Sequence, residues 1–483
     1  MTRLCFLPAL AQARLLRARK LSARELLQAA LDQYALHNDT LNAVVVADID
    51  RARRAAEAAD RRYARGKPLS PVDGVPMTVK ESFDWTGTPT TWGDPRFRDN
   101  IAATDSEAVR RMTAAGAVLY GKTNVPLLLA DWQTFNDIYG TTSNPWDVTR
   151  APGGSSGGSA VALATGMASL EVGSDIGASI RNPAHYCGVY GHKPSFGIVS
   201  LKGQTLTGSV SPSDISVGGP MARSARDLAA MMKILVGPAG PEAQAMTFAL
   251  PPAPQKKFKD FRVAVMLTAP ESEVDQPVQD LLLNLAHFLK RRVRKLSFEA
   301  RPAFTTAEAQ ENYITLLRAA TSRRQSDADF AANLSKAAGF ADADRSYQAT
   351  MTRAYVMRHR DWLNANERRH QMRLLWQAFF EDWDVLLCPA AASAAFPHDH
   401  EGERHSRTIA VNGHRVPTTD QLFWAGYSGN FYLPSTVAPM GLTPQGLPAG
   451  VQIIARSYGD MTAISFAELL EKEFGGFTPP PGY

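Results

Sequence analysis

Cysteine is scarce in this sequence, with three residues among 483, and they lie far apart at Cys5, Cys187 and Cys388. Such a sparse, odd-numbered set argues against a disulfide scaffold and suits a reducing compartment. No apolar run approaches the ~18 residues that a membrane-spanning helix needs. Charges interrupt each apolar stretch of the first 20 residues, so no signal peptide is predicted. We therefore expect a cytoplasmic protein that does not act at a membrane.

An excess of charge of one sign is also missing. The 52 basic and 47 acidic residues leave a net charge of +5, which requires no nucleic-acid partner. Hydrophobic residues make up 45%, which excludes a mainly disordered or fibrous chain. The histidine cluster His398, His400 and His405 lies in a charged segment without the spacing of helical metal ligands. We expect a surface loop there, and neither a metal nor a cofactor in the protein.

The pattern of apolar and polar residues along the chain predicts an α/β fold. Residues 1–65 read as helices, with Ser22 and Glu25 forming a capping box before one of them and a strand at 41–47. Short apolar strands and helices then alternate over about 70–235. The expected strands are 75–80, 118–121 and 170–173, and the expected helices are 106–115 and 159–168.

The rest of the chain is less regular. A proline-rich connection at 237–260 is either a domain linker or a long surface loop. Residues 240–380 form a variable, mostly helical region, and 384–456 look like a return to the same sheet.

The most unusual stretch is 151–194, which holds nine glycines among apolar residues. Interleaved apolar residues argue against a flexible linker and favour close backbone approach. A phosphate-binding loop would need Gly-Lys-Ser/Thr after the glycines, and none follows. Residues 154–158 match the G-x-S-x-G nucleophile elbow, but a loop rather than a strand precedes them. No lysine follows a serine at the spacing of a Ser-x-x-Lys pair.

Lys80 ends the apolar run 75–80. Burial at the end of a strand disfavours the charged ammonium group, and a neutral amine is a general base. A lysine that merely reaches solvent from a strand end is the plainer interpretation of this residue alone.

Taken together, these segments resemble the amidase signature family. The matching motifs are GVPMTVKE at 74–81, GKTN at 121–124, NPWD at 144–147, GGSSGG at 153–158, GSDIGASIR at 173–181, GHKP at 191–194 and GLPAGVQ at 446–452. The resemblance implies that residues 1–483 form one amidase domain, a single α/β/α domain around a large mixed, twisted sheet. It also implies a catalytic triad in which Ser179 is the nucleophile, Ser155 is a bridging serine after a cis peptide bond, and Lys80 is the base.

The family pattern extends to the residues around the triad. Backbone N–H groups of an oxyanion hole would come from Ile176, Gly177, Ala178 and Ser179. Supporting positions would be Gly154, Ser156, Asp175 and Arg181, with Arg181 holding the loop through a carboxylate or, less favoured, binding a substrate carboxylate. One departure is Ala178, where the family often has glycine.

We therefore expect a hydrolase that cleaves a non-peptide carbon–nitrogen bond in an amide, anilide or carbamate through an acyl-enzyme. The apolar segments 127–132 and 423–427 suggest a fairly apolar small-molecule substrate. The main alternative is the glutamine-hydrolysing subunit of a tRNA-dependent amidotransferase, and a catalytically inactive binding protein is a third. We expect a monomer or homodimer without a nucleic-acid partner.

Overall fold

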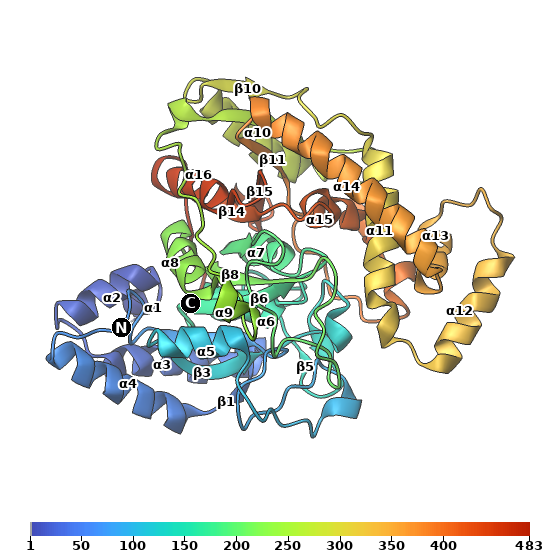
Figure 1. Cartoon of the computed structure of the whole chain (residues 1–483). Coiled ribbons are helices and arrows are strands. Elements are labelled where there is room, and N and C mark those ends of the chain that lie inside the picture. The colour runs from blue at the N-terminus through green and yellow to red at the C-terminus, as the bar shows by residue number, and fades with distance from the viewer. Residues whose placement is uncertain (1) are drawn as a thin grey trace.

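The computed structural model describes residues 2–483, and its centre is one mixed sheet of eleven strands (Figure 1). The strands are, in spatial order, β1 (Val44–Ala47), β3 (Val118–Thr123), β2 (Pro76–Lys80), β6 (Leu170–Asp175), β8 (Val217–Ala222), β7 (Tyr190–Lys193), β14 (Ser435–Leu442), β15 (Pro448–Ala455), β11 (Val385–Pro389), β9 (Arg262–Val265) and β10 (Lys295–Ser297). Parallel pairs join β2 to both β3 and β6, whereas β8, β7, β14 and β15 pair antiparallel with their neighbours.

Helices cover both faces of this sheet, so its central strands are buried throughout. Side chains of β3 alternate accordingly, with Leu119 in one core and Val118 and Tyr120 in another. The Val118 core includes α3 (Ala23–Leu41), α4 (Ile49–Ala64), α6 (Gly157–Ala164) and α7 (Arg181–Cys187). The Leu119 core includes α5 (Glu107–Ala114), α8 (Ala225–Leu235), α10 (Gln276–Lys290), α15 (Leu422–Gly429) and α16 (Asp460–Glu473).

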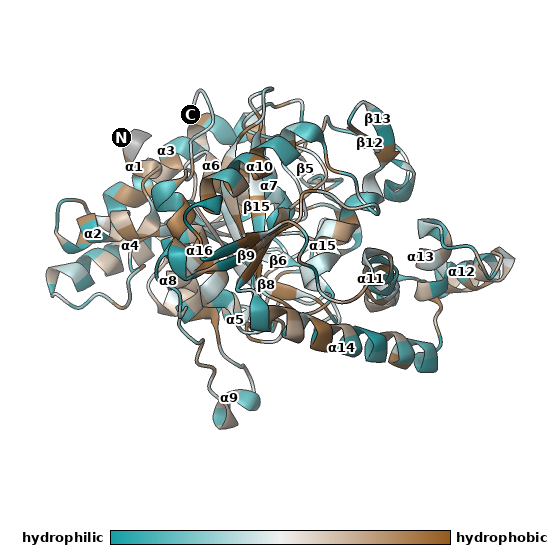
Figure 2. Ribbon diagram, turned by 90° about the horizontal axis from the view of Figure 1, so that it is seen from above, coloured by the Kyte–Doolittle hydropathy of each residue, from teal (hydrophilic) through white to brown (hydrophobic). Residues whose placement is uncertain are grey.

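Four helices form an arm that extends away from the sheet, at the right of Figure 1. They are α11 (Thr306–Thr321), α12 (Asp327–Gly339), α13 (Tyr347–Tyr355) and α14 (His359–Asp382). No residue of α12 is buried, and the outer half of α14 is mainly hydrophilic (Figure 2). The inner part of α14 buries Trp376 against the core, and α11 packs on α15. The arm is therefore joined to the rest of the molecule through α11 and the inner part of α14, and α12 lies outermost.

The expected α/β fold around a large mixed sheet is confirmed. The capping box of Ser22 and Glu25 begins α3 as expected. The strand expected at 41–47 is shorter, because α3 continues to Leu41 and Asn42 ends it in a left-handed conformation. The helix expected at 159–168 instead begins at Gly157. The segment 237–260 contains only the short helices α9 (Glu242–Ala245) and η3 (Phe258–Asp260), and the division of the chain into segments stays a prediction.

Candidate active site

Lys80 is the last residue of β2, and its side chain is completely buried. Its Nζ lies 2.6 Å from Ser155 Oγ and 3.0 Å from Ser174 Oγ. Burial lowers the pKa of Lys80 to about 7, although the negative charges of Asp175 and Glu171 act in the opposite direction. A lysine with this pKa is partly neutral near pH 7, and its amine can then accept a proton from Ser155.

The loop that carries Ser155 is held in an unusual conformation. The peptide bond between Gly154 and Ser155 is cis. A Cβ on Gly154 would lie 2.4 Å from the carbonyl oxygen of Asp131, so only glycine fits there. Ser156 precedes α6, and its N–H donates to the carbonyl of Ser179 over 3.1 Å. This bond joins the loop of Ser155 to the loop of Ser179.

The loop that carries Ser179 is folded around a buried ion pair. Asp175 accepts hydrogen bonds from the N–H groups of Ala178 and Ile180, and Arg181 Nη2 lies 2.8 Å from Asp175 Oδ1. Burial alone would raise the pKa of Asp175, but the charge and hydrogen bonds of Arg181 outweigh it and hold this pKa below its usual value. Arg181 also donates to the Gln452 side chain over 2.6 Å. Arg181 is thus held inside the protein by these contacts and does not line the cavity described below.

The expected set of four oxyanion donors is one too large. The N–H of Ala178, a residue with a φ of 65°, already donates to Asp175 over 3.0 Å. In residues 2–483 the N–H groups of Ile176, Gly177 and Ser179 have no hydrogen-bond partner. The carbonyls of this loop are fixed from outside, since Tyr313 donates to Ile176 and Trp132 donates to Gly177. Three N–H groups are thus available to a negatively charged oxygen.

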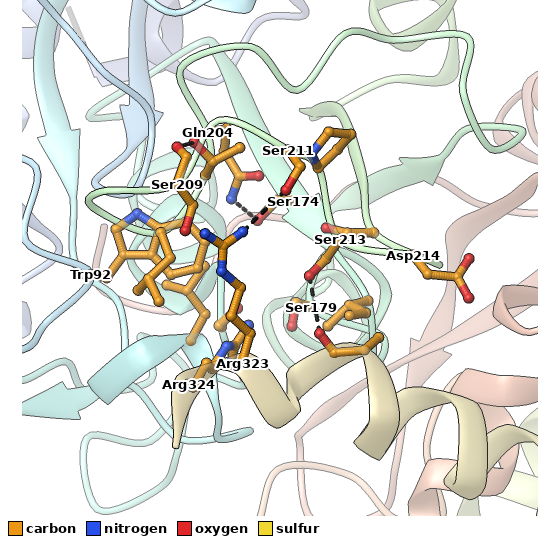
Figure 3. Close-up of a pocket in the computed structure, with 18 residues that line it drawn as sticks. Trp92, Ser174, Ser179, Gln204, Ser209, Ser211, Ser213, Asp214, Arg323 and Arg324 are labelled. Atoms are coloured by element: carbon orange, nitrogen blue, oxygen red, sulfur yellow. Dashed lines mark hydrogen bonds between the residues drawn. The ribbon is translucent and has the colours of Figure 1, made fainter. Parts of the chain in front are cut away.

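Ser155 and Ser179 both line a cavity of about 220 Å³ (Figure 3). The hydrogen bonds of residues 2–483 include none between these two side chains, so the relay from one to the other stays a prediction. The lining residues are Trp92, Leu129, Ser155, Ser174, Ile176, Ser179, Gln204, Thr205, Leu206, Ser209, Ser211, Pro212, Ser213, Asp214, Ser216, Ala320, Arg323 and Arg324. We name Ser209, Ser211, Ser213, Arg323 and Arg324 the arginine wall. Most of the lining residues have polar side chains.

Of the two segments that suggested an apolar substrate, 127–132 contributes a single residue to this cavity and 423–427 contributes none. Tyr427 packs instead against Trp376 and Phe423 packs against Tyr427, both in the core, because α15 is buried on all sides. Of residues 127–132, only Leu129 lines the cavity. The expectation that residues 423–427 lie at the substrate cavity was therefore wrong.

Several residues of the site were missed by the sequence analysis. Ser174 hydrogen bonds to Lys80 and also accepts from Gln204 Nε2 over 3.1 Å. Ser174 lies inside the motif 173–181, so the motif could have suggested it. Gln204 and the two arginines follow no motif, and only the fold brings them to the cavity.

The remaining histidines lie outside the cavity. His185 bonds to the backbone of Gly450 and Ser393, and His192 bonds to Asp460. Neither contacts Lys80 or the two serines. Within residues 2–483, no group of three or more histidine, cysteine or acidic side chains is placed to hold a metal ion. Over the same residues, no helix combines the length and hydropathy of a membrane span.

A buried lysine beside two serine-bearing loops on a mixed sheet is the arrangement of a serine hydrolase, and similarity to known proteins shows the family. The family model described as Amidase matches residues 25–464, so the chain belongs to the amidase family. It is 33% identical over 482 residues to "Putative amidase AmiB2" of Mycobacterium tuberculosis, covering 97% of this chain and 96% of that protein. It is 31% identical over 479 residues to a glutamyl-tRNA(Gln) amidotransferase subunit of an Anaeromyxobacter species, covering 94% of each.

The structure is similar to that of a bacterial aryl acylamidase of the amidase signature family. The TM-score is 0.79, with 97% of this chain and 96% of that one covered and 24% sequence identity. This likeness concerns the fold. Membership of the family and the relatives together support a hydrolase of amides.

Proposed function

We propose that this protein is a stand-alone amidase in which Lys80, Ser155 and Ser179 perform the reaction on a small-molecule amide. The observation that carries the proposal is the 2.6 Å contact between Lys80 Nζ and Ser155 Oγ at a cavity that Ser179 also lines. A serine hydroxyl is a weak nucleophile and an amide a poor electrophile, so the reaction needs a base and a site for the oxyanion.

In the proposed sequence, Ser179 Oγ attacks the amide carbonyl, its proton passes to Ser155, and the proton of Ser155 passes to neutral Lys80. The negative charge on the carbonyl oxygen is stabilised by the N–H groups of Ile176, Gly177 and Ser179. Lys80 then returns the proton through Ser155 to the departing amine, which leaves an ester on Ser179. A water molecule, activated by the same relay, hydrolyses this ester.

The test is covalent labelling with a fluorophosphonate, followed by mass mapping of the adduct. We expect the label on Ser179, and we expect Ser179→Ala to lose both the label and at least ~10⁴-fold in kcat/KM. Ser335→Ala on exposed α12 is the matched control and keeps both. An adduct on Ser155 or Ser156 would assign the nucleophile elsewhere.

A second candidate is the glutamine-hydrolysing subunit of a tRNA-dependent amidotransferase. The 31% identity to the glutamyl-tRNA(Gln) amidotransferase subunit over nearly the whole chain favours it. Release of ammonia from glutamine by the purified protein separates the two candidates. We expect simple amides to be the better substrates.

We also propose a cytoplasmic monomer or homodimer that needs no metal or cofactor and no nucleic acid. Its three cysteines are free and buried, which is compatible with a reducing compartment. Size-exclusion chromatography with light scattering measures the oligomeric state. Activity should survive exhaustive chelation, and a loss that zinc restores would contradict this proposal.

A further inference from the structure

Two arginines line the cavity at the end of the arm's first helix. Arg323 and Arg324 belong to the short helix η4 (Ser322–Arg324), which follows α11 directly. Figure 3 shows both side chains among the residues that surround the cavity, with Arg323 extending toward Ser211. Arg323 Nη1 donates to Ser211 Oγ over 3.2 Å, and Arg324 Nη1 donates to the carbonyl of Leu128 over 2.8 Å. These bonds fix the two guanidinium groups and leave further N–H donors free.

Neither guanidinium has a carboxylate partner. The ion pairs of residues 2–483 involve neither Arg323 nor Arg324. Asp214 is the one acidic residue among those that line the cavity, and it is already bound to Arg369 Nη1 at 2.8 Å and to the Tyr432 hydroxyl. The cavity therefore faces two uncompensated positive charges.

The positive charge of Arg324 persists near neutral pH despite its burial. Burial lowers the pKa of Arg324 to about 10, which still leaves the guanidinium protonated at pH 7. The Arg323 side chain is exposed to solvent. An arginine pair held this way without a counter-ion has an electrostatic cost, and a bound anion would relieve it.

We propose that the substrate is a small amide that also carries a carboxylate, with the carboxylate bound by Arg323 and Arg324 while the amide carbonyl lies at Ser179. This inference rests on the proposed amidase function and specifies its substrate class. The planar guanidinium matches the two oxygens of a carboxylate, and hydroxyls of the arginine wall add further donors. The cavity of about 220 Å³ is smaller than the ~300–1,000 Å³ usual for drug-sized ligands, so a short chain between amide and carboxylate fits best.

The same arrangement disfavours free glutamine. Glutamine carries a carboxylate, but it also carries an ammonium group next to it. The cavity offers two cations and one acidic residue, Asp214, which is already paired. The ammonium group would therefore be repelled without a free carboxylate to bind it.

Kinetics with chain-matched substrates test the proposal. The probes are the monoamides of malonic, succinic, glutaric and adipic acids, each compared with the neutral alkyl amide of the same chain length. We expect the best acid amide to exceed its neutral partner by about 10- to 100-fold in kcat/KM, mainly through KM and more strongly at low salt. Arg323→Gln and Arg324→Gln should each reduce this ratio toward one. Arg360→Gln, at an exposed position of α14, is the matched control and should retain it.

Binding provides a readout that does not depend on turnover. Calorimetry of the Ser179→Ala protein with glutaric acid monoamide should show binding that Arg324→Gln weakens at least ~10-fold and that pentanamide does not match. If the protein hydrolyses neutral amides but neither prefers nor binds the acid amides, the substrate class is wrong and the amidase function stands. If no amide is hydrolysed yet the acid amide binds through the arginines, the proposed function fails and the carboxylate site stands. Equal binding of the acid and neutral amides would overturn the carboxylate site in either case.

Discussion

The cavity is bounded by two regions of opposite construction. The loops of Ser155 and Ser179 are short, rich in glycine and serine, and almost completely buried beside β6 and α7. The arginine wall instead comes from a surface loop and from the junction of α11 with α12, in an arm whose outer helix has no buried residue. The buried loops hold Ser155 and Ser179 in fixed positions, whereas the arm supplies positive charge to the cavity. The comparison suggests that the chemistry and the choice of substrate are separable in this protein.

The largest effect should come from the buried side of this comparison. Lys80→Ala should reduce amide hydrolysis by about 10³-fold or more, because the relay loses its base. In the unaltered protein the rate should rise with pH through an apparent pKa near 7 and then reach a plateau, since Lys80 acts only when neutral and burial lowers its pKa to about 7. Lys80→Ala should abolish this rise. Rate profiles from pH 5 to 10 measure it.

Two features of the site refine this expectation. Burial also raises the pKa of Glu171 to about 7, so the observed value belongs to coupled groups rather than to Lys80 alone. An amide's leaving amine must be protonated and an ester's alcohol needs this less, so Lys80→Ala should impair amides more than esters. Equal losses for both substrates with an unchanged pH profile would make Lys80 a structural residue.

The next effect concerns the contact between α15 and α11, through which the arm is attached to the core. A Cβ on Gly426 of α15 would lie 2.2 Å from Cδ1 of Tyr313 on α11. Gly426→Ala should therefore separate the helices and destabilise the protein by about 1–3 kcal/mol, which lowers the thermal unfolding midpoint. Gly339→Ala is the matched control on α12, where an added Cβ meets nothing within 4 Å, and it should leave the midpoint unchanged or slightly raised. Similar midpoints for the two variants would mean that α15 and α11 adapt easily.

The sequence predicts the buried loops of the site well and the contribution of the arm poorly. Lys80, Ser155 and Ser179 lie in motifs that are local in the chain, and their burial follows from the strands and loops that carry those motifs. Tyr313, Arg323 and Arg324 approach the site only because α11 packs on α15, and no pattern near them marks that contact. Phe423 and Tyr427 were wrongly expected at the substrate cavity for a related reason. An apolar segment does not show by its sequence whether its side chains face a cavity or the core, and every residue of α15 is buried.

A smaller effect should come from a hydrogen bond that the arm donates to the loop of Ser179. The Tyr313 hydroxyl donates to the carbonyl of Ile176 over 2.9 Å and so orients the peptide that follows, whose N–H belongs to Gly177. Tyr313→Phe should lower kcat about 3- to 10-fold with little change in KM, as expected for the loss of one neutral hydrogen bond. Tyr458→Phe, at an exposed position, is the control. A change in KM alone would indicate that Tyr313 acts on substrate binding and not on the loop.

The smallest effect tests whether the arm influences the base at all. The positive charge of Arg324 contributes to the lowered pKa of Lys80, after the larger contribution of burial, whereas Asp175 and Glu171 act in the opposite direction. Removing that charge in Arg324→Gln should raise the pKa of Lys80, so the rising limb of the pH–rate profile should move to higher pH. The shift should stay below about one pH unit, because the charge acts at a distance and solvent screens it. Arg324→Lys retains the charge and should retain the profile, which separates electrostatics from packing. An unchanged profile in Arg324→Gln would show that the arm does not affect the pKa of Lys80. A shift to lower pH would contradict the expected sign of the interaction between Arg324 and Lys80.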